Sequence, residues 1–148
     1  MKTWRYVLGA MACMSLIFLF SSLPADRLGP DSMPLDVLKK VGHGVEFGVL
    51  AILYLYAMKG GRSVGEAGRA VFLLSFFLTV LFAATDEYHQ SFTPGRHSSV
   101  VDVFIDSCGA IVFLGLLHRV KTGQYFGTEK PFFAQRRKGA KKEFLTVS

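Results

Sequence analysis

The chain has 148 residues, of which 51% are hydrophobic and 14% aromatic, and its mean hydropathy is +0.35. Such a composition excludes an ordinary soluble domain, in which a buried apolar face alternates with a wet one. The net charge of +6 arises after His118, where eight basic residues stand against two acidic ones, so the rest of the chain is neutral overall. We therefore expect a small integral membrane protein.

Four apolar runs, at 6–23, 41–58, 70–85 and 100–118, follow one another along the chain. A helix needs about 20 residues to cross a hydrocarbon core of about 30 Å. The runs predict an all-α polytopic fold with four transmembrane helices and short connections, and leave no room for a fifth. We expect this domain to cover 1–118, followed by a basic, partly disordered tail over 119–148.

The first run has an alternative interpretation as a cleaved signal peptide, because Lys2 and Arg5 precede it. However, the run is longer than the usual core of about 7–15 residues. A cut after Ala25 would also leave Leu23, which is not a small residue, three positions before the cleavage point. We expect the run to remain as a membrane helix.

Basic residues are distributed unevenly among the connections. They gather at the N-terminus, in the connection between the second and third runs, and in the tail. The positive-inside rule then predicts a multi-pass protein of the cell membrane with both termini in the cytoplasm. The tail acts mainly as a topology signal in this interpretation, with anionic lipid as its alternative partner, and we expect no nucleic acid partner.

The third run ends where ionisable residues begin. As a helix over 70–85 it would be only about 24 Å long, which is too short to span a membrane. Extension to Gln90 supplies a full span and brings Asp86, Glu87 and His89 into the helix. Because a helix C-terminus disfavours negative charge, another group must stabilise these carboxylates.

Ionisable residues also stand near the start of the second and fourth runs. His43 and Glu46 are three positions apart and share a helical face, as do Asp102 and Asp106 at i and i+4. In an up-down bundle these pairs lie at the same end as the acidic end of the third helix. Charges facing lipid cost several kcal/mol, so we predict a polar pocket that opens outward.

Structural roles are the alternative for several of these residues. Ser99 and Asp102 match the capping-box pattern at a helix start. Asp106 can form a buried hydrogen bond or salt bridge with His43, and Gln90 an interhelical hydrogen bond. These alternatives stay open at this stage.

The connection between the third and fourth runs contains Pro94 and Gly95, which predict a type II turn with a positive φ at the glycine. Arg96 follows, close to the start of the fourth helix. A guanidinium beside a helix N-terminus favours an anion site, and neighbouring carboxylates such as Asp106 are the alternative partners.

Small residues recur in the second and fourth runs and predict close helix packing there. They are Gly42, Gly44, Gly48, Gly109 and Ala110.

The stretch from Asp86 to Gly109 reads D-E-x-H-Q-x-F-x-P-G-R-x-x-S-x-x-D-x-x-x-D-x-x-G, and Lys40 begins a K-x-x-H-x-x-E pattern. Together these motifs resemble the VanZ-like membrane proteins, a family named for a protein associated with teicoplanin resistance. The resemblance covers about residues 5–118. It implies a four-helix membrane fold and a role at the cell envelope in glycopeptide susceptibility. The matching site positions are His43, Glu46, Asp86, Glu87, Gln90, Arg96, Asp102 and Asp106.

Three functions fit this pattern. The first is binding of a phosphate-bearing membrane lipid or lipid-linked cell-wall precursor. The second is an intramembrane enzyme, with acid and base groups or a divalent metal on oxygen ligands; whether the protein is an enzyme stays open. The third is a proton relay, which the restriction of ionisable groups to one end disfavours. The candidate catalytic residues are His43, Glu46, Asp86 and Glu87; the candidate ligand-binding residues are Gln90, Arg96, Ser99, Asp102 and Asp106; the candidate metal ligands are Asp86, Glu87 and Asp106.

Overall fold

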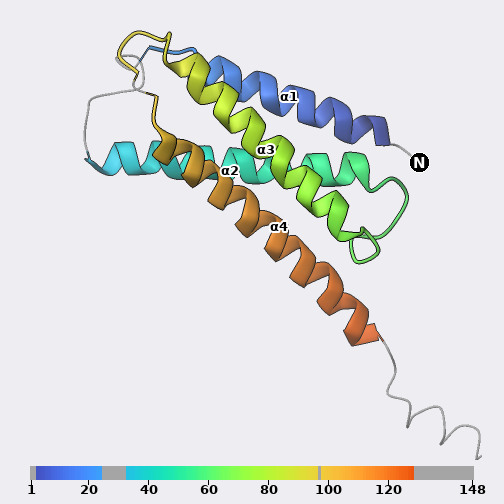
Figure 1. The fold of residues 1–148 in the computed structure, drawn as a ribbon. Helices are drawn as coiled ribbons and strands as arrows, with labels where there is room; N and C mark the ends of the chain where they lie inside the picture. Colours follow the sequence, from blue (N-terminus) through green and yellow to red (C-terminus); the bar gives the residue numbers. More distant parts are fainter. Residues whose placement is uncertain (1–2, 25–32, 97, 129–148) are drawn as a thin grey trace, which may run out of the picture.

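The computed structural model describes residues 3–24, 33–96 and 98–128. They form four helices, α1 (Thr3–Ser21), α2 (Met33–Met58), α3 (Arg69–Gln90) and α4 (Val100–Thr128), which run up and down in a bundle (Figure 1). Each helix contains a segment that is long and apolar enough to cross a membrane. The predicted all-α fold with four transmembrane helices is therefore confirmed.

The helix bounds agree with the sequence prediction at some ends and differ at others. α3 does extend to Gln90. α2 begins earlier than predicted, at Met33, and Pro34 is compatible with this start because the first turn needs no intrahelical N–H bond. α4 continues past His118 to Thr128, so the first part of the predicted tail is helical. The remainder of that tail, 129–148, lies outside the described residues.

α2 packs against α4, α1 and α3, and most extensively against α4. α3 also packs against all three other helices, whereas the described backbones of α1 and α4 do not come close to one another. The core consists of two apolar clusters along α2. One comprises Ala10, Ile17, Phe47, Leu50 and Ala83; the other comprises Ala51, Leu55, Val64, Ala110 and Leu114.

Polar and apolar side chains are distributed in the reverse of a soluble protein. Large apolar side chains are exposed on all four helices, whereas Ser75, Thr79, Asp86 and Asp106 are buried. Ser75 donates to the carbonyl of Val71 at 2.8 Å, and Thr79 to that of Ser75 at 2.8 Å, so these hydroxyls are satisfied within α3. Apolar side chains outside and satisfied polar groups inside suit a lipid environment, because lipid tails offer no hydrogen bonds to polar groups.

The closest approach of two helices lies where α2 crosses α4. A Cβ built on Gly109 would lie 2.7 Å from the carbonyl carbon and 2.9 Å from the Cα of Gly44, and would overlap that residue's carbonyl oxygen. A Cβ on Gly48 would lie 2.6 Å from the ring of Phe113. The predicted close packing through small residues is present at this crossing, and it draws the starts of α2 and α4 together.

The connection between α2 and α3 is held by its own polar groups. Gly60 has a φ of 63°, which ends α2 in the left-handed conformation that glycine favours. The Ser63 amide donates to Glu66 Oε2 at 2.9 Å, and the Glu66 amide to Ser63 Oγ at 3.2 Å. The first of these bonds, helped by a hydrogen bond with the Ser63 side chain, lowers the pKa of Glu66 below its ordinary value.

Candidate functional site

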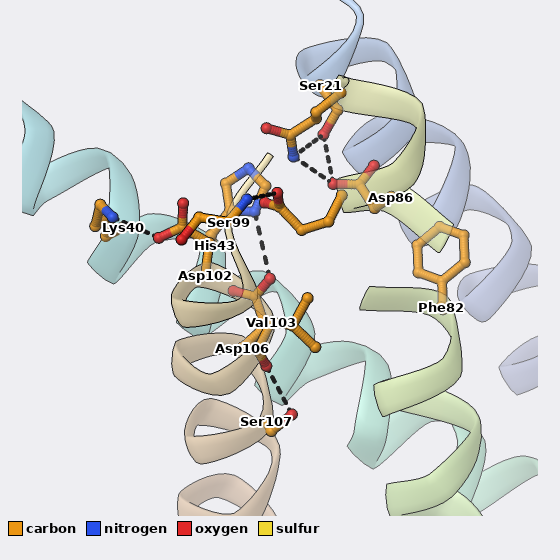
Figure 2. A network of polar contacts seen from close by, with 12 residues as sticks. Ser21, Lys40, His43, Phe82, Asp86, Ser99, Asp102, Val103, Asp106 and Ser107 are labelled. Carbon is orange, nitrogen blue, oxygen red and sulfur yellow. Dashed lines mark hydrogen bonds and ion pairs between the residues drawn. The ribbon is translucent and has the colours of Figure 1, made fainter. Parts of the chain in front are cut away.

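The ionisable residues predicted from the sequence meet at the end of the bundle where α1 and α3 end and α2 and α4 begin, which we call the polar end. Figure 2 shows Ser21 beside Asp86, and His43 beside Asp106, with Lys40 and Asp102 farther out. Four helices therefore contribute to one polar network (Figure 2). The opposite end of the bundle holds the connection between α2 and α3.

Asp86 is the centre of the α1 and α3 part of the network, and its residue is only 3% exposed. Its Oδ2 accepts from Ser21 Oγ at 2.7 Å and from Gln90 Nε2 at 2.7 Å. Gln90 Nε2 also lies 3.3 Å from Ser21 Oγ, so the three side chains form a closed triangle. The predicted interhelical hydrogen bond of Gln90 is thus present, and it orients the carboxylate of Asp86.

Arg96 turns toward α1. Its Nη2 donates to the carbonyl of Phe20 at 3.0 Å, its Nε to that of Leu23 at 3.4 Å, and its Nη1 to Gln90 Oε1 at 3.1 Å. The guanidinium therefore satisfies carbonyls at the C-terminus of α1, where a cation also complements the helix dipole. The oxygens that it contacts belong to two carbonyls and an amide and not to a carboxylate such as Asp106, which differs from one of the two interpretations of the sequence.

The turn that carries Arg96 has the predicted form. Gly95 has a φ of 73°, and the Arg96 amide donates to the carbonyl of Thr93 at 3.1 Å across Pro94. Thr93 Oγ1 in turn lies 3.4 Å from the carbonyl of Ser21. The tight turn thus brings both Thr93 and Arg96 against the end of α1.

His89 supplies a further link between α3 and α1. Its Nε2 shares a hydrogen bond of 3.0 Å with Ser22 Oγ, and its ring stacks on Phe18 with centroids 4.2 Å apart. His97 lies outside the described residues.

The start of α4 departs from the predicted capping box. Ser99 does cap the helix, because its Oγ accepts from the amide of Val101 at 3.1 Å. The Ser99 amide, however, donates to Glu87 Oε2 on α3 at 2.8 Å and not to Asp102. Asp102 instead forms an ion pair with Lys40 on α2. In a capping box the carboxylate of Asp102 would accept from the Ser99 amide. Here Asp102 is paired with Lys40, and Glu87 on the neighbouring helix α3 accepts from that amide instead.

His43 and Asp106 form the innermost contact between ionisable side chains of α2 and α4. His43 Nδ1 lies 3.8 Å from Asp106 Oδ2, which is an ion-pair distance but too long for a hydrogen bond. Asp106 is 2% exposed, and it lies about 9 Å along α4 from the first residue of that helix. Glu46 and Asp86 are close enough to interact electrostatically with both members of this pair.

Three carboxylate oxygens at the polar end have no hydrogen-bond partner. In the described ranges these are the only buried side-chain nitrogen or oxygen atoms in that condition: Glu46 Oε2, Asp86 Oδ1 and Asp106 Oδ1. They come from α2, α3 and α4. A buried polar atom without a partner costs about 1–3 kcal/mol, and more when it is charged. Their conjunction makes the polar end the candidate for a binding or reaction site.

The structure does not bring the candidate metal ligands close enough to chelate one metal ion; these ligands are Asp86, Glu87 and Asp106. Among residues 3–24, 33–96 and 98–128, no three His, Cys, Asp or Glu side chains form a group suited to a metal ion. Two carboxylates already serve other groups, since Glu87 accepts from Ser99 and Asp86 from Ser21.

Sequence reasoning missed Ser21. A serine at the end of an apolar run has no pattern that distinguishes it from Ser15, which merely bonds the carbonyl of Met11 at 2.9 Å. The available signal was the topology, because α1 has to end at the same membrane surface as α3.

Comparison with known proteins identifies the family. The family model VanZ/LLP1 matches residues 6–121, which include α2 and α3, most of α1 and α4, and all the residues of the polar end. No curated protein and no solved structure matches the chain. The family match covers most of the chain, and the four apolar helices agree with a multi-pass membrane protein. The chain belongs to the VanZ/LLP1 family.

Proposed function

We propose that this protein binds a phosphate-bearing lipid or a lipid-linked cell-wall precursor at the polar end, and that it thereby influences susceptibility to glycopeptides of the teicoplanin type. The observation that carries the proposal is the set of three buried carboxylate oxygens without partners, on three helices. Such groups are costly in a membrane protein and are retained where a ligand uses them.

The distribution of charge supports an outward-facing polar end. The connection at the opposite end carries Lys59 and Arg62, with Arg69 just after it, and α4 carries Arg119 and Lys121 at the same level. By the positive-inside rule, this basic side faces the cytoplasm of the cell membrane and both termini lie there. The polar end then faces the envelope, where cell-wall precursors occur.

The residues of the polar end have different tasks in this proposal. His43 and Glu46 are half-buried and form the accessible part of the site. Asp86 and Asp106 lie behind them and supply acceptors. Arg96 acts through Gln90 and the end of α1, and so keeps the acceptors in position.

A substitution series tests the proposal. Asp106→Asn and Glu46→Gln keep the side-chain shape and remove a charge, whereas Glu66→Gln does the same in the connection at the opposite end. Each variant is introduced into a strain lacking the native protein, and teicoplanin susceptibility is measured together with membrane abundance. We expect the first two variants to lose the effect on susceptibility at normal abundance, and the control to retain it. Retention by both site variants at normal abundance would contradict the proposal.

An enzyme is the second candidate, because one observation favours it. His43 lies 3.8 Å from the buried carboxylate of Asp106, which can orient the imidazole and stabilise its charged form. Glu46 interacts electrostatically with both. In this version the imidazole moves a proton to or from a lipid-linked substrate. Mass spectrometry of envelope lipids incubated with purified protein, with and without Mg²⁺, measures it: a product lost on His43→Gln supports catalysis, and unchanged lipids rule it out.

A further inference from the structure

The buried polar atoms that lack partners at the polar end are all of one chemical kind. Glu46 Oε2, Asp86 Oδ1 and Asp106 Oδ1 are hydrogen-bond acceptors that carry negative charge when ionised. The described part of the chain has no buried side-chain donor in the same condition. When these carboxyl groups are ionised, a ligand that completes the site supplies donors, and a positive charge improves the match.

The cations nearest to the acceptors already have partners. Arg96 donates to two carbonyls of α1 and to Gln90, and Lys40 is paired with Asp102. His43 faces Asp106. A phosphate entering among the carboxylates would thus meet like charge and further acceptors, which is unfavourable in a medium of low dielectric constant.

From this balance we infer that the group bound among Glu46, Asp86 and Asp106 is a primary ammonium carried by an amine-bearing lipid headgroup, while the lipid phosphate stays at the membrane surface. The inference rests on the proposed lipid-binding function and names the part of the ligand that enters. An ammonium has three N–H donors and one positive charge, and the three free acceptors come from α2, α3 and α4. His43 faces Asp106 and has a side chain that is 21% exposed, so we place the entry of the ammonium beside it.

Two kinds of lipid carry this group beside a phosphate. One is a phospholipid with an ethanolamine headgroup, and the other is a phospholipid to which an amino acid with a free amine is esterified. Both present a primary ammonium in the headgroup that also carries the phosphate, and the free acceptors match this shared chemistry.

The test uses full-length protein in detergent, titrated with short-chain lipids and followed by native mass spectrometry. Phosphatidylethanolamine provides the ammonium, phosphatidylcholine keeps the positive charge without N–H donors, and phosphatidylglycerol provides hydroxyls without the cation. Lysyl-phosphatidylglycerol is the fourth arm, and its affinity relative to phosphatidylethanolamine distinguishes the two sources. We expect the primary-amine lipids to bind about 10- to 100-fold more tightly than the other two, the range expected for one or two charge-assisted hydrogen bonds.

Variants connect this preference to the site. Asp106→Asn and Glu46→Gln should each weaken binding of the amine lipids about 10-fold or more and leave phosphatidylcholine unchanged, whereas Glu66→Gln should change neither. A thermal unfolding transition near that of the native protein shows that a variant is folded, and two site variants are used so that one remains informative.

The outcomes separate this inference from the proposed function. Equal binding of all four lipids, weakened equally by both site variants, would overturn the ammonium inference and leave lipid binding at the polar end intact. A preference for amine lipids that neither variant alters would place the ammonium elsewhere in the protein. This result would also overturn the inference. If no phospholipid and no lipid-linked precursor binds in a manner that depends on the polar end, the proposed function itself falls.

Discussion

Replacement of Gly109 by alanine gives the sharpest test of the helix packing that assembles the polar end. The new Cβ would lie 2.7 Å from the carbonyl carbon of Gly44, whereas ordinary contacts begin near 3.4 Å. Because the obstacle is backbone, no side-chain rotation relieves it. The carbonyl carbon alone requires α2 and α4 to separate by roughly 0.7 Å, and the overlapping carbonyl oxygen requires more, which weakens the dispersion contacts along their whole interface. Overpacking of this kind costs about 1–3 kcal/mol.

The separation should also affect the site, because Gly44 follows His43 and Gly109 lies one turn beyond Asp106. The contact of 3.8 Å between His43 Nδ1 and Asp106 Oδ2 has little room to lengthen before it is lost. We therefore expect Gly109→Ala to lower both the stability and the ligand binding of the protein. Equilibrium unfolding in mixed detergent micelles measures the first, and lipid titration the second.

Two other glycines serve as controls on the same helices. A Cβ at Gly44 would meet its nearest atom, the carbonyl oxygen of Ile105, at 3.7 Å, and a Cβ at Gly115 would meet nothing within 4 Å. Gly44→Ala should be tolerated, and Gly115→Ala should stabilise the protein by up to about 1 kcal/mol through helix propensity. If Gly109→Ala is as stable as the native protein, or if Gly44→Ala costs the same, the described helix crossing is incorrect.

Three further predictions concern the polar network. Arg96→Lys should cost about 1.5–3 kcal/mol in unfolding free energy, because an ammonium cannot reproduce the fork that contacts two carbonyls and an amide oxygen; unchanged stability would argue against this role. Ser21→Ala should cost about 1–3 kcal/mol, since it removes a donor from a buried carboxylate, whereas Ser15→Ala should stay within about 0.5 kcal/mol, and equal effects in the same unfolding assay would contradict the network. Lys40→Ala should cost less than about 1 kcal/mol and lose even that effect in high salt, because the lysine side chain is 46% exposed; a larger, salt-independent loss would refute it.

The architecture was accessible from sequence because length and hydropathy constrain a membrane protein strongly. The need for a full span predicted that α3 continues to Gln90, and helical periodicity put His43 with Glu46 and Asp102 with Asp106 on shared faces. These inferences use only distances along one helix. They required no knowledge of how the helices are rotated against one another.

Details that depend on contacts between helices were less accessible. The capping pattern assigned Asp102 to the start of α4, but Glu87 occupies that role because α3 passes beside it. Arg96 was expected near an anion or a carboxylate, whereas its long side chain reaches back to α1. Several residues satisfy the local pattern, and tertiary proximity decides which of them is used.

The position of Arg96 has a consequence for how the protein is made. Its hydrogen-bond partners Phe20 and Leu23 lie 76 and 73 residues earlier in the chain. Until Arg96 is synthesised, the carbonyls of Phe20 and Leu23 lack this donor, and α1 can be held only by its apolar face and, once α3 is complete, by the contacts of Ser21 and Ser22 with that helix. The contacts between Arg96 and the end of α1 are therefore the last of the bonds between α1 and the segment 86–96 whose partners the ribosome supplies.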